Sequence, residues 1–137
     1  MLNERKTKIF KSYSFYNTMR VKAVEEKAIK LVQKYLTKKG IKSKRVSRCG
    51  YDIKTSTKKI EIKSRSKSYT RILILNYSNI KAFNKEKNIE LWAVTGVNTK
   101  HPILIKLDRP TVRKRKVEHM TWRVDLHNKD YDNCINL

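Results

Sequence analysis

The sequence is poor in acidic residues, cysteine, glycine and proline. It holds 12 Asp and Glu against 34 Lys and Arg, a formal net charge of +22 over 137 residues. This balance favours a polyanionic partner, because phosphate contacts that release counterions supply most of the affinity of basic proteins for nucleic acid. The two cysteines, Cys49 and Cys134, lie far apart and do not form a zinc site of the usual spacing. We expect ordinary thiols rather than a structural disulfide.

Long apolar runs and glycine-rich loops are also missing. Only 3 glycines occur, and none of them forms a glycine-rich phosphate-binding loop. The sequence also shows no Ser-His-Asp arrangement and no internal repeat. No stretch is apolar over the length of a membrane span, and the N-terminus lacks the apolar segment of a secretory signal. We therefore expect an intracellular protein, cytoplasmic or nucleoid-associated. It should bind DNA rather than a membrane and need no small-molecule cofactor.

The chain predicts one α/β domain over residues 20–126. Its clearest helix is expected over 20–39, where apolar residues recur at helical spacing until Gly40, a residue suited to ending a helix. Residues 1–19 are basic and aromatic without a clear period. We expect these residues to form a basic N-terminal arm. Three alternatives stay open for it: contact with a phosphate backbone, packing on a partner subunit, or partial disorder. Residues 127–137 are expected as a C-terminal tail.

Apolar segments in the second half predict the sheet. Residues 71–75 are expected as a central strand and 89–97 as a strand buried on both faces. Further strands are expected over 102–107 and, at an edge, over 120–126. A short helix near residues 78–87, capped by Asn76 or Ser78, should follow the first of these strands.

The stretch from 50 to 64 predicts a hairpin that turns between residues 56 and 57. This turn sets Asp52 opposite Glu61 and Ile53 opposite Ile60. Side chains alternate along strands, so one face of the hairpin should be wholly apolar. Its members are Tyr51, Ile53, Ile60 and Ile62.

The other face of this hairpin carries Asp52, Glu61 and Lys63. Directly opposed residues lie roughly 4.5–5.5 Å apart at Cβ, and two carboxylates that close repel each other unless a proton or a cation lies between them. Hard cations such as Mg²⁺ bind carboxylate oxygens, and an ammonium group beside a metal suits the activation of water against a phosphodiester. The alternative is a surface hairpin whose charges are merely solvated.

The order of these features resembles the PD-(D/E)XK nuclease superfamily. The motif core is Asp52 with Glu61-Ile62-Lys63, followed by Ser64, whereas Gly50-Tyr51 stands in place of the family's Pro-Asp. The chain is similar to small archaeal Holliday-junction resolvases. It is also similar to restriction-type domains related to Mrr and to the plant NO VEIN C-terminal region, which often read Gly-Tyr-Asp-Ile before Glu-x-Lys-Ser. The resemblance covers about residues 20–107 and implies a restriction-endonuclease-like fold, with a mixed central sheet flanked by helices.

The resemblance also implies a role for each motif residue. Asp52 and Glu61, helped by the main-chain carbonyl of Ile62, would hold one or two Mg²⁺ ions, for which Mn²⁺ can substitute. Lys63 would position the attacking water and favour its deprotonated form. Glu25, at the margin of the buried stripe of the 20–39 helix, would bind a second metal directly or through water. Glu26 is the alternate, although it points more to solvent on the helical wheel.

Cations and hydroxyl groups near the motif and in a second basic cluster are candidates for contacting DNA phosphates. They are Lys11, Lys42, Lys44, Arg45, Arg48, Ser64, Arg65, Ser66, Lys67, Arg113, Lys114 and Arg115. Residues 41–49 could equally be a solvated sheet edge, because lysine discourages pairing between edges.

The function expected from these features is Mg²⁺-dependent endonucleolytic hydrolysis of DNA, either structure-specific, as in Holliday-junction resolution and recombination, or restriction-like. A homodimer is expected, because cutting two strands is simplest with two sites related by a twofold axis. One alternative is a non-catalytic basic nucleic-acid-binding protein, architectural or ribosome-associated. Another is a nuclease that acts on RNA or single strands, although the paired aromatics of an RNA-reading sheet are missing.

Overall fold

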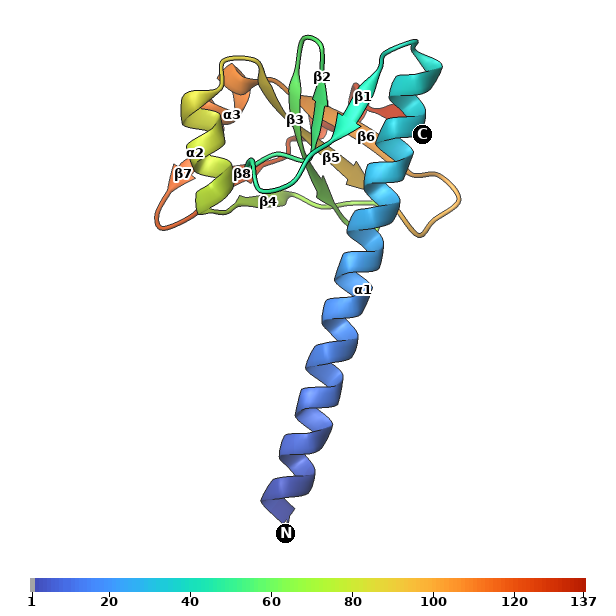
Figure 1. The fold of residues 1–137 in the computed structure, drawn as a ribbon, viewed down its shortest axis with the longest axis vertical. Coiled ribbons are helices and arrows are strands. Elements are labelled where there is room, and N and C mark those ends of the chain that lie inside the picture. Colours follow the sequence, from blue (N-terminus) through green and yellow to red (C-terminus); the bar gives the residue numbers. More distant parts are fainter. Residues whose placement is uncertain (1) are drawn as a thin grey trace.

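The longest element is helix α1 (Leu2–Lys38), whose first half extends away from the rest of the protein (Figure 1). The computed structural model describes the backbone of residues 2–137 and the side chains of residues 19–137, so Lys11 lies outside the described side chains. The helix begins well before residue 20, because neither glycine nor proline interrupts the sequence ahead of Gly40. Gly40 follows its last turn with a φ of 73°. No described helix has an apolar stretch long enough to cross a bilayer.

A mixed six-stranded sheet forms the centre of the domain, as the sequence predicts. Its order is β1-β2-β3-β5-β6-β9, and only the pairing of β3 with β5 is parallel. The strands are β1 (Ser43–Arg45), β2 (Ile53–Thr55), β3 (Lys59–Ser64), β5 (Ile89–Thr95), β6 (Ile103–Leu107) and β9 (Ile135–Asn136).

A second sheet of three strands has the order β4-β8-β7 and holds β4 (Ile72–Leu75), β8 (Trp122–Asp125) and β7 (Val117–Glu118). Two predictions are wrong here. Residues 71–75 are not central, because β4 is an edge strand with Ile72 and Ile74 exposed; β8 lies in the middle rather than at an edge. A four-residue apolar run suits a central strand or a half-buried edge equally well, and only the pairing decides between them.

Helices cover both faces of the main sheet. On one face, α1 packs Ala28, Val32 and Leu36 against Ile60 and Trp92. On the other lie α2 (Tyr77–Lys85), α3 (Arg109–Arg115) and the small sheet. Residues of β5 contribute to both clusters, so the prediction that this strand is buried on both faces is confirmed. The α/β fold class is confirmed with it.

The last eleven residues pack against the domain. Helix α4 (Asn128–Asp132) places the Tyr131 hydroxyl in hydrogen bonds with the backbone of Thr70, and β9 pairs with β6. Asp130 of α4 forms an ion pair with Arg115 of α3 in which both side chains are largely buried. These contacts make residues 127–137 part of the packed structure.

The hairpin of β2 and β3 has the predicted pairing only in part. Ile53 lies opposite Ile60, as predicted. The backbone N–H of Asp52, however, donates to the Ile60 carbonyl (2.9 Å), so the ladder shifts by one position before Tyr51. Tyr51 therefore packs with the core under α2. The prediction that Tyr51 lies on the same face of the hairpin as Ile53 is wrong.

Candidate active site

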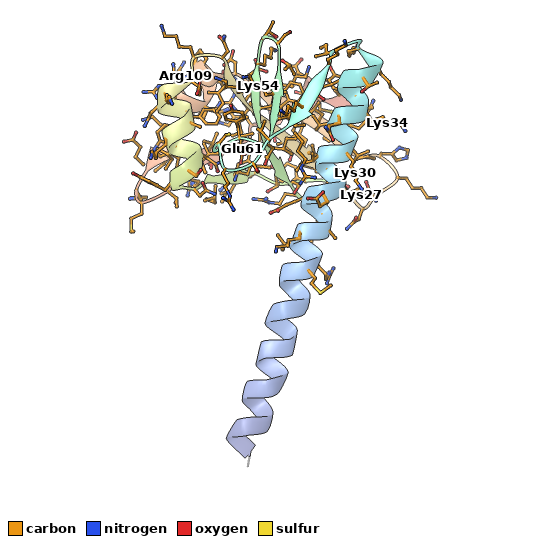
Figure 2. All side chains as sticks on the ribbon, in the orientation of Figure 1. Lys27, Lys30, Lys34, Lys54, Glu61 and Arg109 are labelled. Carbon is orange, nitrogen blue, oxygen red and sulfur yellow. The ribbon has the colours of Figure 1, made fainter. Side chains whose placement is uncertain are left out.

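Glu61 lies at the centre of the candidate site, in the middle of β3. Its side chain faces α2, because its neighbours Ile60 and Ile62 point into the core under α1. Glu61 is only 5% exposed, and Figure 2 shows it in the middle of the domain, between α1 and α2. Burial raises the pKa of this carboxyl to about 8, and the nearby Asp52 carboxylate adds to the rise, whereas Lys63 opposes it.

Asp52 lies beside Glu61 just before β2, where the ladder has shifted. One of its carboxylate oxygens, Oδ2, accepts a hydrogen bond of 2.8 Å from the backbone N–H of Ile62. The close approach of the Asp52 side chain further raises the pKa of Glu61. The N–H and C=O of one strand residue point to the same side, so the Ile62 carbonyl also faces the side of Asp52. The structure thus places the Asp52 and Glu61 carboxyl groups side by side, with the Ile62 carbonyl, which the resemblance implied as a metal ligand, facing the same side.

Lys63 completes this cluster. Its ammonium nitrogen lies 3.1 Å from Oε2 of Glu61 and donates a hydrogen bond of 3.0 Å to Oδ1 of Asn79. The Lys63 side chain is 19% exposed, so the amine is fixed between two partners rather than extended into solvent.

Asn79 is the site residue that the sequence analysis missed. It is the third residue of α2, forms a reciprocal capping box with Asn76, and is 4% exposed. Its amide nitrogen donates to the Gly50 carbonyl at 2.8 Å. The Asn-x-x-Asn spacing carries a signal for the helix cap. Nothing in that spacing indicates that β3 brings Lys63 against the same side chain.

Gly50 allows α2 to approach the hairpin this closely. It has a φ of 80°, and a Cβ atom there would overlap the carbonyl oxygen of Ser78 and lie 3.0 Å from the Cβ of Ala82. A side chain at this position would therefore force α2 away, and Asn79 with it. Gly50-Tyr51, which replaces the Pro-Asp of the resemblance, thus has a packing role of its own.

The cluster opens into a cavity of about 1210 Å³ between α1, the segment from β1 to β2, β3 and the start of α2. The cavity wall includes five cationic side chains besides Lys63. They are Arg20, Lys27, Arg45, Arg48 and Arg65. A cavity with acids at its floor and cations on its walls suits a phosphate-bearing ligand.

Glu25 lines the same cavity but is exposed. Among the side chains that the structure describes, no three His, Cys, Asp or Glu residues lie close enough together to hold a metal ion. Glu26, the alternate, forms two hydrogen bonds with the Arg45 guanidinium. The hydrogen bonding to Arg45 lowers the pKa of Glu26.

The candidate phosphate-binding residues divide into three groups. Five line the cavity: Arg45, Arg48, Ser64, Arg65 and Ser66. Three are exposed but are not part of the cavity wall: Lys42, Lys44 and Lys67. The remaining described candidates lie on α3, also outside the cavity wall: Arg113, Lys114 and Arg115.

Arg115 is engaged within the protein. Its guanidinium donates to both carboxylate oxygens of Asp130 and to the Asp125 carbonyl, and its side chain is 12% exposed. Burial acts to raise the pKa of Asp130, but the bonds from Arg115 and from the His127 backbone hold it below its ordinary value. The contacts of Arg115 therefore connect α3 to α4.

Fold and site together define an α/β domain in which Asp52, just before β2, lies beside Glu61 of the central strand β3, which also carries Lys63. Residues 24–107 match the sequence model of a family described as Protein NO VEIN, C-terminal. This match spans more than half of the chain, and the chain belongs to that family. It includes the complete cluster from Gly50 to Asn79 but ends before α3. No curated protein matches the chain.

Proposed function

We propose that this protein is a metal-dependent endonuclease of the PD-(D/E)XK type that hydrolyses DNA phosphodiester bonds. The observation that carries the proposal is that the Asp52 carboxylate lies beside the Glu61 carboxyl group, whose Oε2 is 3.1 Å from the Lys63 amine, in a cavity lined by further cationic side chains. A basic protein that only binds nucleic acid has no need to bury an acid beside a second one.

The donor set fits Mg²⁺, with Mn²⁺ as a substitute. Two carboxyl groups and a carbonyl would supply the hard oxygen ligands that Mg²⁺ prefers, and water or substrate oxygens would complete its coordination. Burial disfavours the charged form of Glu61 and the neighbouring Asp52 carboxylate adds to this effect, so the pKa of Glu61 is raised to about 8. A cation bound between the two groups would stabilise the Glu61 carboxylate. When bound, the metal would activate water and stabilise charge on the scissile phosphate.

The side chains around this position have separate roles in the proposal. The Lys63 ammonium is held between Glu61 and Asn79. From this position Lys63 would orient the attacking water and favour its deprotonated form. Arg48 and Arg65 on the cavity wall bind the phosphates that flank the scissile one. Glu25, exposed on the same wall, would bind a second metal through water.

The test compares cleavage of linear, nicked and four-way-junction DNA in Mg²⁺ by wild type, Asp52→Ala, Glu61→Ala and Lys63→Ala. We expect each substitution to lower the cleavage rate about a hundredfold or more, while DNA binding without metal stays close to wild type. The controls are Glu118→Ala and Lys129→Ala, which remove an exposed acid and an exposed lysine outside the cavity wall. Equal cleavage by all six proteins would contradict the proposal.

The substrate panel also addresses the finer parts of the proposal. Preference for the four-way junction supports a resolvase, whereas equal cutting of linear duplex supports a restriction-like enzyme. Two copies related by a twofold axis would cut both strands, and sedimentation of the DNA complex measures that stoichiometry. Tight binding without cleavage of any substrate would leave a non-catalytic nucleic-acid-binding protein as the better description.

A further inference from the structure

Asn79 links the parts of the candidate site that come from different elements. Its Oδ1 accepts hydrogen bonds from the Lys63 ammonium (3.0 Å) and from the backbone N–H of Asn76 (3.2 Å). Its Nδ2 donates to the Gly50 carbonyl (2.8 Å), two residues before Asp52. One buried amide therefore contacts α2, β3 and the entry to β2.

The capping role of Asn79 does not require all of these contacts. A residue at the third position of a helix completes a capping box with a single acceptor for the N-cap backbone N–H. The other two contacts lead to Lys63 and towards Asp52. Since Asn79 is 4% exposed, solvent does not compete for either contact.

We propose that Asn79 is a positioning residue that fixes the Lys63 amine, through Oδ1, and the approach to Asp52, through Nδ2. This inference rests on the proposed nuclease function for its effect on cleavage, although the positioning itself is a property of the protein without substrate. Lys63 has a flexible four-carbon side chain whose amine would otherwise be held by Glu61 alone. Once Glu61 binds a cation, Asn79 is the partner that keeps the amine in place.

Two substitutions at this position separate the role of Oδ1 from that of Nδ2. Asn79→Ala removes both the acceptor and the donor. Asn79→Asp keeps an acceptor for Lys63 and Asn76 but removes the donor to Gly50. Asn76→Ala is the matched control, because it deletes the side-chain cap on the Asn79 N–H while leaving the Lys63 contact in place.

The first readout is the order of the Lys63 ε-methylene group, measured by ¹³C relaxation in the metal-free protein and assigned with Lys63→Ala. We expect Lys63 to become mobile in Asn79→Ala and to remain ordered in Asn79→Asp and Asn76→Ala. An ordered Lys63 in Asn79→Ala would overturn the inference, as would a mobile Lys63 in Asn79→Asp. A residue that only caps α2 would leave this readout unchanged.

The second readout is cleavage in Mg²⁺ under single-turnover conditions. We expect Asn79→Ala to lower the cleavage rate constant about tenfold with little change in the Kd for DNA, since a misplaced catalytic group reduces rate rather than binding. Failure of wild type to cleave any DNA would refute the nuclease function. The Lys63 relaxation measurement would still decide whether Asn79 positions the amine.

Discussion

The carboxylate of Asp52 accepts a hydrogen bond of 2.8 Å from the backbone N–H of Ile62, the residue between Glu61 and Lys63. The Asp52 side chain thus supplies the acceptor for the Ile62 N–H at the point where the strand pairing has shifted. The bond holds Asp52 directly beside the strand that carries the other two groups. The spatial relationship of the three motif residues therefore depends on one side-chain contact as well as on sheet geometry.

The raised pKa of Glu61 predicts a pH-dependent stability in metal-free buffer. Its folded-state value of about 8 exceeds the ordinary 4.5, so the folded protein binds a proton that the unfolded chain releases. This contribution is fully present below pH 4.5 and is lost as the pH rises to 8. One pKa unit corresponds to about 1.4 kcal/mol, so denaturant unfolding should show a loss of several kcal/mol across this range. Glu61→Gln should remove that pH dependence, and an equal slope in both proteins would contradict the assignment.

Metal binding should release a proton from the same carboxyl group. At pH 7 Glu61 is mostly protonated, and a cation bound there requires the carboxylate. Calorimetry of Mg²⁺ or Mn²⁺ binding in buffers of different ionisation enthalpy should therefore report about one proton released per site. The affinity should rise about tenfold per pH unit between pH 6 and 7. Binding to wild type without proton release would show that Glu61 is not a ligand.

Gly50 and Gly40 form a matched pair for testing the contact with α2. Both have positive φ, but a Cβ at Gly40 meets nothing within 4 Å, whereas one at Gly50 overlaps the Ser78 carbonyl. We expect Gly40→Ala to cost about 1 kcal/mol of stability from backbone strain alone, and Gly50→Ala to cost several kcal/mol more. Chemical denaturation measures both, and equal losses would mean that α2 moves aside without cost.

Arg48 combines backbone strain with a place on the cavity wall. It is the one described non-glycine residue with positive φ, at 61°, and its side chain is exposed. Arg48→Gly should leave stability unchanged or raise it by up to about 1 kcal/mol, because glycine adopts this conformation without strain. The same change should weaken DNA binding and reduce the salt slope of log K by about 1.

Arg48→Lys is the control for this prediction, since it keeps both the charge and the strain. Filter binding at several salt concentrations, together with denaturant unfolding, measures both effects. Weakened binding by Arg48→Lys equal to that of Arg48→Gly would show that the charge at this position is not what binds DNA.

The sequence was most informative where the interacting residues are close along the chain. The alternation of Ile53, Ile60 and Ile62 predicted the hairpin and its apolar face, because a short turn leaves few alternative registers. The same alternation failed at Tyr51, where one backbone bond shifts the ladder. It also did not distinguish the edge strand β4 from a central one, since burial of β4 depends on β8, about fifty residues further along the chain.

By itself the sequence determined the basic charge, the end of the first helix just before Gly40, and the placing of Asp52, Glu61 and Lys63 near one another, because all of these follow from composition or local periodicity. Only the tertiary structure decided that Asn79 holds the Lys63 amine and that Arg115 pairs with Asp130. Each of these depends on how helices pack on the sheet. Packing brings together side chains from separate elements by burying apolar surface, and no local pattern records which polar groups then meet.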